Sequence, residues 1–474
     1  MASVLPIALA EWRLIARHRS TWLLFALFVV LIATAAGLNR ARQVRDRAQQ
    51  LDYQRLVRAQ WEGQPDRHPH RVSHYGTFAF RPPGPLAAID PGVESYTGRV
   101  QYLEAHRQNA ANFAEAGALS SAFRLGELSL AFVLQLVLPL VTIVLGHRAL
   151  AGEHETGRLR FLLAQGVSQR ALAFGKLGGL ALALAPFGAA GAVAAVLVAL
   201  TDLAFAADAA APARLAVFAA AVLLHSAAWL ALTLWVSARA KTSARACAVL
   251  VMLWLGSSVV VPRIAAVAAA ARHPLPDKSS FTAAVAADTR KLGDAHNPDD
   301  PHYAQFKAET LARYGVTRVE DLPVNYAGIL MARGEELSAQ TFARHFAALG
   351  ETMQAQADFV NGWGLVAPTL ALRALSAAAA GTDLRADLKF QREAEAYRYA
   401  FVQQLNGLHR DEVRYDDDKD QKLSADHWKR FPDFRTAPPT LREALTGTGV
   451  AWLVLVLWTL VPLVGLARTD LRTA

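Results

Sequence analysis

Residues 177–200 read LGGLALALAPFGAAGAVAAVLVAL and contain no charged side chain. A helix rises about 1.5 Å per residue, so a run of this length can cross the roughly 30 Å hydrocarbon core of a bilayer. Its single proline, Pro186, is tolerated inside a membrane span when neighbouring helices satisfy the freed carbonyl. The run therefore predicts a transmembrane helix, which the adjoining residues extend to 171–201.

Five further runs have the same character. The chain has 474 residues, of which 53% are hydrophobic and 19% charged, whereas an ordinary soluble domain has about 25% charged residues. The fifth span is short, and we expect Pro262 to end it. The predicted fold class is an all-α membrane protein with six transmembrane helices. The other five spans are predicted at 20–38, 128–147, 212–237, 243–262 and 446–468.

The residues before the first span have an amphipathic pattern. Leu5, Leu9 and Trp12 share one face, with arginines beside them. This spacing predicts an amphipathic helix at 1–19 that lies in the membrane interface. The span that follows ends near an Ala-Thr-Ala sequence, as a cleaved signal peptide would, but its apolar part of about 18 residues exceeds the 7–15 of such a signal. We therefore expect an uncleaved anchor.

Basic residues in the short loops set the predicted orientation. The loops at 148–170 and 238–245 are rich in arginine and lysine, whereas the loop at 202–211 carries two aspartates. Because basic loops stay in the cytoplasm, six spans place both termini there. The arginines at 40–47 directly follow the first span and oppose this assignment. They belong to a loop longer than about 60 residues, in which the charge rule has little force.

Two long segments outside the spans are expected on the far side of the membrane. The first extracytoplasmic insertion, 39–127, begins with a helical pattern and becomes rich in turn residues after Gly63. The second, 263–445, has mostly helical patterns and predicts a largely helical extracytoplasmic domain. Within it, 363–380 is apolar but contains Arg373, so we predict a buried or interfacial helix there rather than a seventh span.

The loop at 148–170 contains the most informative motif. It reads RALAGEHETGRLRFLLAQGVSQR. Two glutamates precede Gly157, and Leu159, Leu162 and Leu163 form the apolar face of a short helix flanked by arginines. A short helix with exposed charges at a membrane exit is suited to receiving motion from a soluble partner. An ordinary solvated cluster of charges is the alternative interpretation.

This loop resembles that of type-2 ABC exporter permeases. In that family Gly-Glu-x-Glu-x-Gly-Thr-Leu precedes a coupling helix, and Gly-Lys opens the third span, as Gly175 and Lys176 do here. Arg158 stands where threonine is common in the family, but this difference does not change the class of protein that the motif indicates. The residues that we expect to couple to an ATPase are Gly152, Glu153, Glu155, Gly157, Arg158, Leu159 and Arg160.

The long external segments narrow the resemblance. HRVSHYGTFAFRP at 70–82 and NPDDP at 297–301 look like a subgroup with large extracytoplasmic insertions, related to the permease of nitrous-oxide reductase maturation. The resemblance implies a permease in the bacterial inner membrane, surrounded by lipid and paired with a second copy or a paralogue. In such a complex a cytoplasmic ABC ATPase dimer would bind ATP and Mg and hydrolyse the ATP, so the chain itself would be no enzyme. The resemblance also allows a periplasmic partner. The cargo and its direction stay open.

No nucleotide or nucleic-acid site is expected in the chain itself. A phosphate-binding loop needs Gly-x4-Gly-Lys followed by Ser or Thr, but Leu177 follows Lys176 and Arg170 replaces the first glycine. The single cysteine, Cys247, excludes multi-cysteine metal sites. The net charge of +9 is explained by the membrane topology, so nucleic acid is not an expected partner.

His68, His70 and His74 are the clustered candidate metal ligands. Imidazole suits zinc or copper, but this spacing matches no defined zinc motif. The simpler interpretation is a proline-rich surface loop whose histidines bond to the backbone. The metal interpretation supports an alternative function for the chain, namely an ATPase-independent membrane scaffold or metal chaperone that uses these external histidines.

Overall fold

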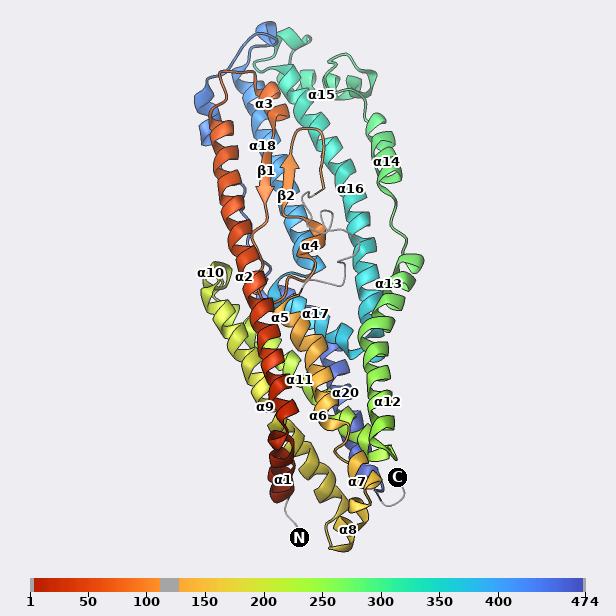
Figure 1. Ribbon diagram of the computed structural model, residues 1–474. Helices are drawn as coiled ribbons and strands as arrows, with labels where there is room; N and C mark the ends of the chain where they lie inside the picture. Colours follow the sequence, from red (N-terminus) through yellow and green to blue (C-terminus); the bar gives the residue numbers. More distant parts are fainter. Residues whose placement is uncertain (1–3, 111–127, 472–474) are drawn as a thin grey trace.

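The computed structural model describes residues 4–110 and 128–471. Residues 111–127, in the first predicted insertion, lie outside the described residues, as do 1–3 of the predicted N-terminal helix. The molecule is elongated and almost entirely helical (Figure 1). A bundle of apolar helices forms one end. The other end, which we call the stalk, consists of α3 (Pro69–Tyr75), β1 (Thr77–Phe80), β2 (Val100–Leu103), α14 (Lys278–Arg290), α15 (Ala304–Tyr314), α18 (Leu384–Glu412) and the outer parts of α2 (Arg19–Glu62) and α16 (Tyr326–Gly362).

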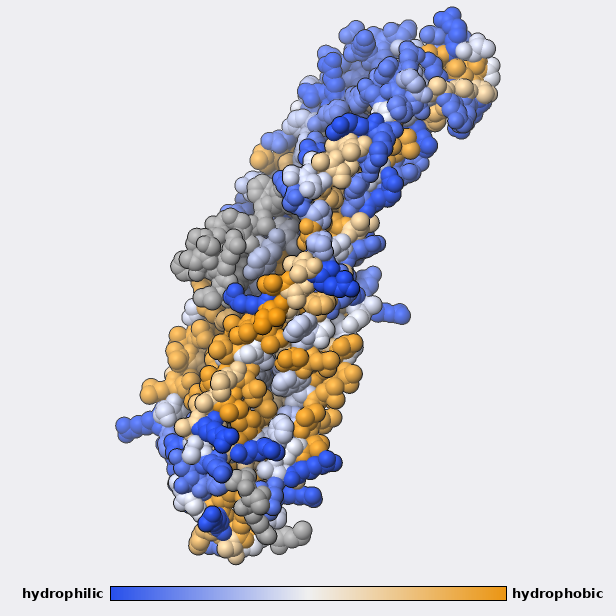
Figure 2. Space-filling model, turned by 90° about the vertical axis from the view of Figure 1, so that its right-hand side faces the viewer, coloured by the Kyte–Doolittle hydropathy of each residue, from blue (hydrophilic) through white to orange (hydrophobic). Residues whose placement is uncertain are grey.

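Within residues 4–110 and 128–471, six helices are long and apolar enough to cross a membrane. Their outer faces carry exposed apolar side chains such as Leu23, which is 71% exposed. Figure 2 shows these side chains as a hydrophobic band over the lower half of the molecule, with hydrophilic surface on either side. The chain is therefore a helical multi-pass membrane protein, as predicted. The six are Arg19–Glu62 (α2), Leu130–Glu155 (α5 to α7), Gln169–Thr201 (α9), Ala211–Arg239 (α11), Ser243–Arg272 (α12 to α13) and Gly449–Arg468 (α20).

The N-terminal amphipathic segment forms its own helix, α1 (Val4–Arg17). It ends at His18, whose extended backbone separates it from α2. Helix α1 packs closely along α9 because glycines on α9 leave room for it. A Cβ added at Gly179 would lie 2.5 Å from the Cβ of Glu11, and one at Gly175 would lie 2.6 Å from that of Ile7. Only glycine therefore permits this approach.

Helix α2 (Arg19–Glu62) runs without a break from the membrane into the stalk. Its 44 residues span about 66 Å. Beyond the apolar part, Arg40 donates a hydrogen bond to the carbonyl of Thr201 at the end of α9. A cation at a helix C-terminus is stabilised by the helix dipole. The arginines that opposed the charge rule thus begin where α2 leaves the bundle.

Both π-helical segments of the described chain end two residues before a proline. The segment η3 (Val133–Val137) precedes Pro139 in α6 (Leu138–Gly146), and η4 (Gly256–Val260) precedes Pro262. Proline lacks an N–H and clashes with the carbonyl four residues earlier, and the wider π turn relieves that clash. The prediction that Pro262 ends the fifth helix is therefore wrong, because α12 (Ser243–Leu255) continues through η4 into α13.

Helix α17 (Pro368–Ala380) joins the bundle to the stalk. It is buried and packs against α11 and α20, in agreement with a buried helix rather than a further span. Arg214 of α11 fixes this junction, because its guanidinium is 2.7 Å from Asp208 and also donates to the carbonyls of Ala379 and Pro439.

The stalk contains one element that the all-α prediction lacked. Strands β1 (Thr77–Phe80) and β2 (Val100–Leu103) form an antiparallel pair, with Thr77 opposite Leu103 and Phe80 opposite Val100. These strands of four residues lie within a turn-rich stretch, so their alternation is too short to stand out in the sequence.

Two long helices, α16 (Tyr326–Gly362) and α18 (Leu384–Glu412), form the length of the stalk (Figure 1). Trp61 at the end of α2 packs on Phe401 of α18 and donates to the carbonyl of Trp428, 2.7 Å away. The remaining helices are α3 (Pro69–Tyr75), α4 (Glu94–Thr97), α5 (Leu130–Phe132), α7 (Ala151–Glu155), α8 (Arg158–Ala164), α10 (Leu203–Ala207), α13 (Val261–Arg272), α14 (Lys278–Arg290), α15 (Ala304–Tyr314) and α19 (Leu441–Leu445), with 3-10 turns η5 (Pro301–Tyr303), η6 (Val319–Asp321), η7 (Trp363–Leu365), η8 (Tyr415–Asp417) and η9 (Ala425–Arg430).

Candidate functional site

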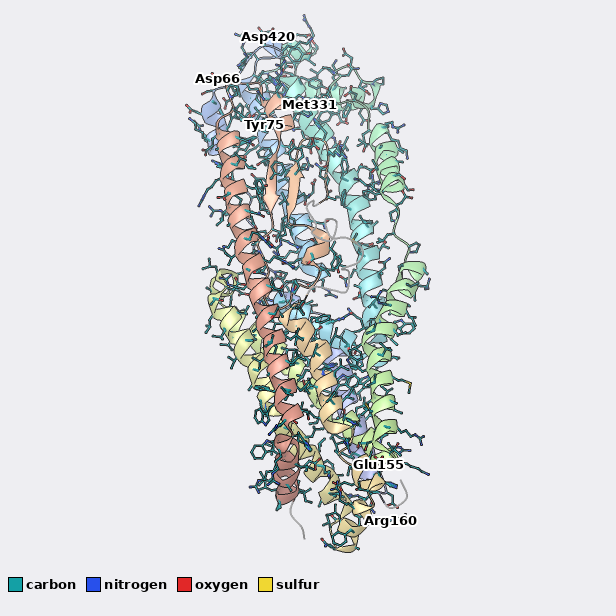
Figure 3. All side chains as sticks on the ribbon, viewed as in Figure 1. Asp66, Tyr75, Glu155, Arg160, Met331 and Asp420 are labelled. Carbon is teal, nitrogen blue, oxygen red and sulfur yellow. The ribbon has the colours of Figure 1, made fainter. Side chains whose placement is uncertain are left out.

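The predicted coupling segment lies at the end of the molecule opposite the stalk. We call residues 148–170 the elbow. It contains α7 and α8, and both chain termini lie at the same end (Figure 1). Figure 3 shows Glu155 and Arg160 of the elbow at one extreme, and Asp66 and Tyr75 of the stalk at the other. The segment thus occupies a membrane exit.

Gly157 forms the turn between the two short elbow helices. Its φ of 73° is a left-handed conformation that favours glycine, and a Cβ there would meet no atom within 4 Å. The backbone conformation, rather than packing, therefore requires this glycine. Gly152 is buried, and a Cβ there would lie 3.5 Å from the Oγ of Ser243, which is ordinary contact.

Glu153 belongs to a buried ionic group that joins three helices. Lys176 of α9 lies 2.6 Å from Glu153 Oε1 and 2.8 Å from Glu11 Oε2 of α1. These residues are 4%, 8% and 7% exposed, respectively. Arg158 Nε lies 2.9 Å from Glu153 Oε2 and completes a balanced set of two cations and two carboxylates. Buried charges persist only with such partners, so this group holds the elbow to α1 and α9.

Glu155 ties the elbow to α12. Its Oε2 accepts hydrogen bonds from the backbone N–H of Ser243, at 3.1 Å, and from the Ser243 hydroxyl, at 2.7 Å. The Oγ of Ser237 in α11 accepts from the N–H groups of Leu150 and Ala151, each at 3.0 Å. The elbow is therefore fixed to four helices.

The outward surface of the elbow includes Glu155 and several side chains of α8, whereas Glu153 is buried. Phe161 is 64% exposed, and Arg158 and Arg160 are also exposed. Leu159, by contrast, is 5% exposed and packs against Leu150 and other apolar side chains, as the predicted helix face requires. A soluble partner would touch the arginines, Phe161 and Glu155. Of the two glutamates in the motif, the buried Glu153 positions α8 through Arg158, whereas the exposed Glu155 also bonds to α12.

The three predicted metal ligands do not form one set. His68 is the N-cap of α3, and its Nδ1 accepts a hydrogen bond from the N–H of His70. Its ring lies 4.5 Å from that of His409, whose Nε2 is 2.6 Å from Asp418 Oδ1. His68 therefore belongs to a separate group with His409 and Asp418.

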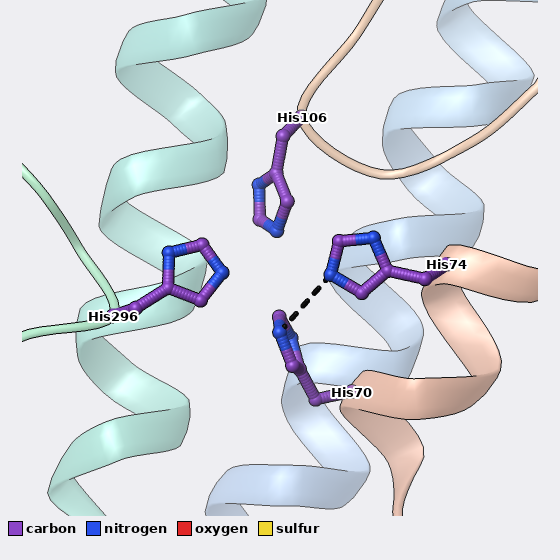
Figure 4. Close-up of side chains that lie close together, drawn as sticks. All are labelled: His70, His74, His106 and His296. Atoms are coloured by element: carbon purple, nitrogen blue, oxygen red, sulfur yellow. Dashed lines mark hydrogen bonds between the residues drawn. The ribbon is translucent and has the colours of Figure 1, made fainter.

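His70 and His74 instead meet two histidines that no sequence motif singled out. One turn of α3 separates the pair, which places their Nε2 atoms 3.2 Å apart. His106, after β2, and His296, before η5, complete a four-histidine cluster whose candidate ligand atoms all lie within 4.8 Å of one another. Figure 4 shows the four rings around one central space. The i, i+4 spacing on a helix was the sequence signal for half of this set.

Burial and neighbouring imidazoles keep His68, His70 and His74 uncharged. Burial, followed by the neighbouring imidazoles, lowers the pKa of His70 to about 3. Burial and His409 lower that of His68 to about 4, and burial with His106 and His296 also lowers the pKa of His74. At neutral pH these rings are therefore neutral, which is the form that binds metal.

Two carboxylates orient the other members of the four-histidine cluster. Glu335 Oε2 lies 3.1 Å from His106 Nδ1, and Asp294 Oδ1 lies 3.0 Å from His296 Nδ1. Burial alone raises the pKa of Glu335, but the His106 hydrogen bond and the charge of Arg398 outweigh it and hold the pKa at about 2. Glu335 is thus a charged acceptor, 2.6 Å from Arg398 Nη1 in the core of the stalk.

Comparison with known families covers only part of the second long segment between the predicted spans, including α17 at its junction with the bundle. Residues 279–437 match the family model of a domain of unknown function, DUF3526. This region, about a third of the chain, includes His296 and Glu335 of the four-histidine cluster and stops short of the elbow. No curated protein matches the chain.

Proposed function

We propose that the chain is the membrane-spanning permease subunit of an ABC transporter, and that a cytoplasmic ABC ATPase dimer docks on the elbow. The observation that carries this proposal is the attachment of the elbow to α1, α9, α11 and α12. A force on α8 therefore acts on much of the bundle at once. A loose surface loop would instead bend and dissipate the motion.

Two continuous helices extend the motion beyond the bilayer. The fifth span begins at Ser243, beside Glu155, and continues to Arg272, where α13 packs against α16 of the stalk. Helix α2 likewise joins the bundle to the stalk. The proposed outcome of ATP hydrolysis is export between two protomers, or mechanical work on a periplasmic component. The second protomer is a copy of this chain or a paralogue.

The distribution of basic residues supports the orientation that this function needs. The elbow, the α11–α12 turn and both termini lie at one end of the molecule, and the first two are rich in arginine and lysine. By the positive-inside rule this end is cytoplasmic. We accordingly place the chain in a bacterial inner membrane, with the stalk in the periplasm.

The proposal is tested by co-expressing the chain with an ABC ATPase encoded beside its gene and purifying the complex in lipid nanodiscs. Arg160→Glu combined with Phe161→Asp should abolish co-purification and lower the ATPase rate at least about tenfold, because a docking interface concentrates its affinity in a few arginine and aromatic side chains. Arg468→Glu makes the same charge change at this end of the molecule but outside α8, and should have no effect.

The second candidate is an ATPase-independent scaffold or metal chaperone, which the histidine groups of the stalk favour. It makes the opposite prediction for the elbow. If the Arg160→Glu and Phe161→Asp chain folds and keeps its cellular function, whereas histidine variants lose it, the scaffold or chaperone is correct and the permease proposal fails.

A further inference from the structure

We propose that His70, His74, His106 and His296 form a four-coordinate zinc site at the membrane-distal end of the stalk. Three separate segments supply the ligands, namely α3, the turn after β2 and the loop between α14 and η5. A bound ion would therefore fasten the first external segment to the second. This inference concerns the stalk and does not depend on the permease proposal.

The positions of the ring nitrogens suit a tetrahedral ion. Zinc binds histidine nitrogen at about 2.0 Å, which places the nitrogens of a tetrahedral set roughly 3.3 Å apart. His70 Nε2 and His74 Nε2 already lie 3.2 Å apart. The whole set lies within 4.8 Å, so small side-chain rotations suffice to reach the tetrahedral spacing. The central space in Figure 4 is where the ion would bind.

The carboxylates leave the correct nitrogens free. Because Glu335 and Asp294 bind the Nδ1 atoms of His106 and His296, the Nε2 atoms of these rings are left to face the centre. Histidines that bind metal commonly hold a carboxylate through their other nitrogen in this manner. The Nε2 of His106 is buried and makes no hydrogen bond with the described residues. An ion at the centre would satisfy it.

The backbone at His106 is held in an uncommon conformation. Its φ of 61° is the only positive value at a non-glycine residue in the described chain. The N–H of His106 donates to Glu335 at 2.9 Å, and the neighbouring carbonyl of Glu104 accepts from Arg398 at 3.0 Å. Such backbone strain persists only where surrounding contacts enforce it, and it concentrates at functional sites. Here the enforced conformation brings the imidazole to the cluster.

The donor set selects zinc among the common metals. Four imidazoles provide no oxygen ligands for magnesium or calcium, and no thiolate or thioether for copper(I). Cys247 lies in α12, within the bundle and far from the stalk. Copper(II) also binds imidazole but prefers a tetragonal arrangement, whereas a tetrahedral set of nitrogens suits zinc.

The structure supplies a closely matched control for the cluster. His296 and His302 each follow an aspartate at i−2 that binds both the histidine N–H and its Nδ1. Only His296 belongs to the cluster, and His302 lies on the same external segment but outside it. A comparison of the two tests the cluster itself rather than the local turn.

The experiment uses the full-length chain, purified without a polyhistidine tag, stripped with chelator and titrated with zinc. We expect one zinc ion per chain bound at this cluster, at least about a hundred-fold weaker binding in His296→Ala, and unchanged binding in His302→Ala. Asp294→Asn should weaken binding about 10- to 100-fold, because it removes the orienting carboxylate. Cobalt(II) substituted for zinc should give the visible absorption of a tetrahedral site, which His74→Ala abolishes.

Several results would overturn the inference. Wild-type chain that binds no zinc refutes it, as do equal losses in His296→Ala and His302→Ala. A site abolished by His409→Ala but not by His74→Ala would place the metal in the other histidine group. Copper(II) bound at these residues in tetragonal geometry, in preference to zinc, would refute the identity of the metal. Unchanged thermal unfolding of the metal-free variants shows that each has folded.

Discussion

Lys176 is the residue on which the elbow depends most. It is the buried cation between Glu11 and Glu153, and Arg158 reaches the second of these carboxylates from the surface. Loss of one member of a buried ion group leaves the others charged without compensation, which costs more than the ion pair itself contributes. The effect of a substitution at Lys176 therefore depends on the charges that stay buried without a partner.

Lys176→Met should lower the free energy of unfolding by about 3–5 kcal/mol, because two buried carboxylates lose their common cation. Thermal unfolding in detergent measures this change. Lys241→Met removes an exposed lysine from the α11–α12 turn and should leave the midpoint unchanged. Leucine at Glu11, Glu153 and Lys176 together should restore most of the stability. A triple variant less stable than Lys176→Met would contradict this explanation.

The sequence identified the elbow glutamates but not the direction in which they point. Glu11 and Lys176 are 165 positions apart, and Glu155 and Ser243 are 88 apart. Lys176 and Glu155 were notable by themselves, in a Gly-Lys pair and in a charged motif, whereas no pattern singled out Glu11 or Ser243. Nothing local shows that such distant residues meet, because their pairing is determined by how α1, α9 and α12 pack.

Among the elements, the contact between α1 and α9 is sensitive to side-chain volume. A methyl group added at Gly179 would meet backbone as well as a side chain, since its carbon would lie 2.7 Å from the carbonyl oxygen of Ala8. Gly188 lies on the same helix, and a methyl group there would meet nothing within 4 Å. The two glycines thus separate the effect of helix propensity from that of packing.

Gly179→Ala should destabilise the protein by about 1–3 kcal/mol, because α1 must move away from α9. Gly188→Ala should be neutral or stabilise it by up to about 1 kcal/mol, since alanine is the better helix former. Thermal unfolding of the two variants, together with disulfide cross-linking between α1 and α9, measures both effects. Equal midpoints would show that α1 is not tightly packed.

Whole spans were easier to predict than the elements of the stalk. A bilayer requires long charge-free helices, so each span leaves a local record in the sequence. The strands at Thr77–Phe80 and Val100–Leu103 form by pairing with each other, so neither is marked by a pattern in its own stretch of sequence. The four-histidine cluster was half visible for the same reason, because His70 and His74 share one helix while His106 and His296 arrive through tertiary contacts.

At the scale of the whole molecule, the elbow and the histidine-bearing stalk lie at opposite ends (Figure 1), and an apolar band crosses the surface between the two ends (Figure 2). The permease proposal places these ends in different compartments. Because Cys247 is the only cysteine, a cysteine-free background needs a single substitution. Arg160 and Tyr75 are exposed positions at the two ends.

In a Cys247→Ser background, a membrane-impermeant maleimide applied to spheroplasts should label Tyr75→Cys and leave Arg160→Cys unmodified. Permeabilised cells should label both, and the background chain alone should show no labelling. The reason is that the band of apolar helices separates the two positions by the thickness of a bilayer. Labelling of Arg160→Cys from outside would place the elbow beyond the reach of any ATPase and end the permease proposal.

The unbroken course of α2 has a consequence for how far the stalk can travel. A helix of about 66 Å that tilts by about 10° at its membrane end sweeps its far end through about 11 Å. The extra length thus works as a lever, since it magnifies a slight rocking of the bundle into a stroke comparable with the width of a helix. The tip of the stalk would then sweep past whatever it touches, while the apolar helices below hardly shift.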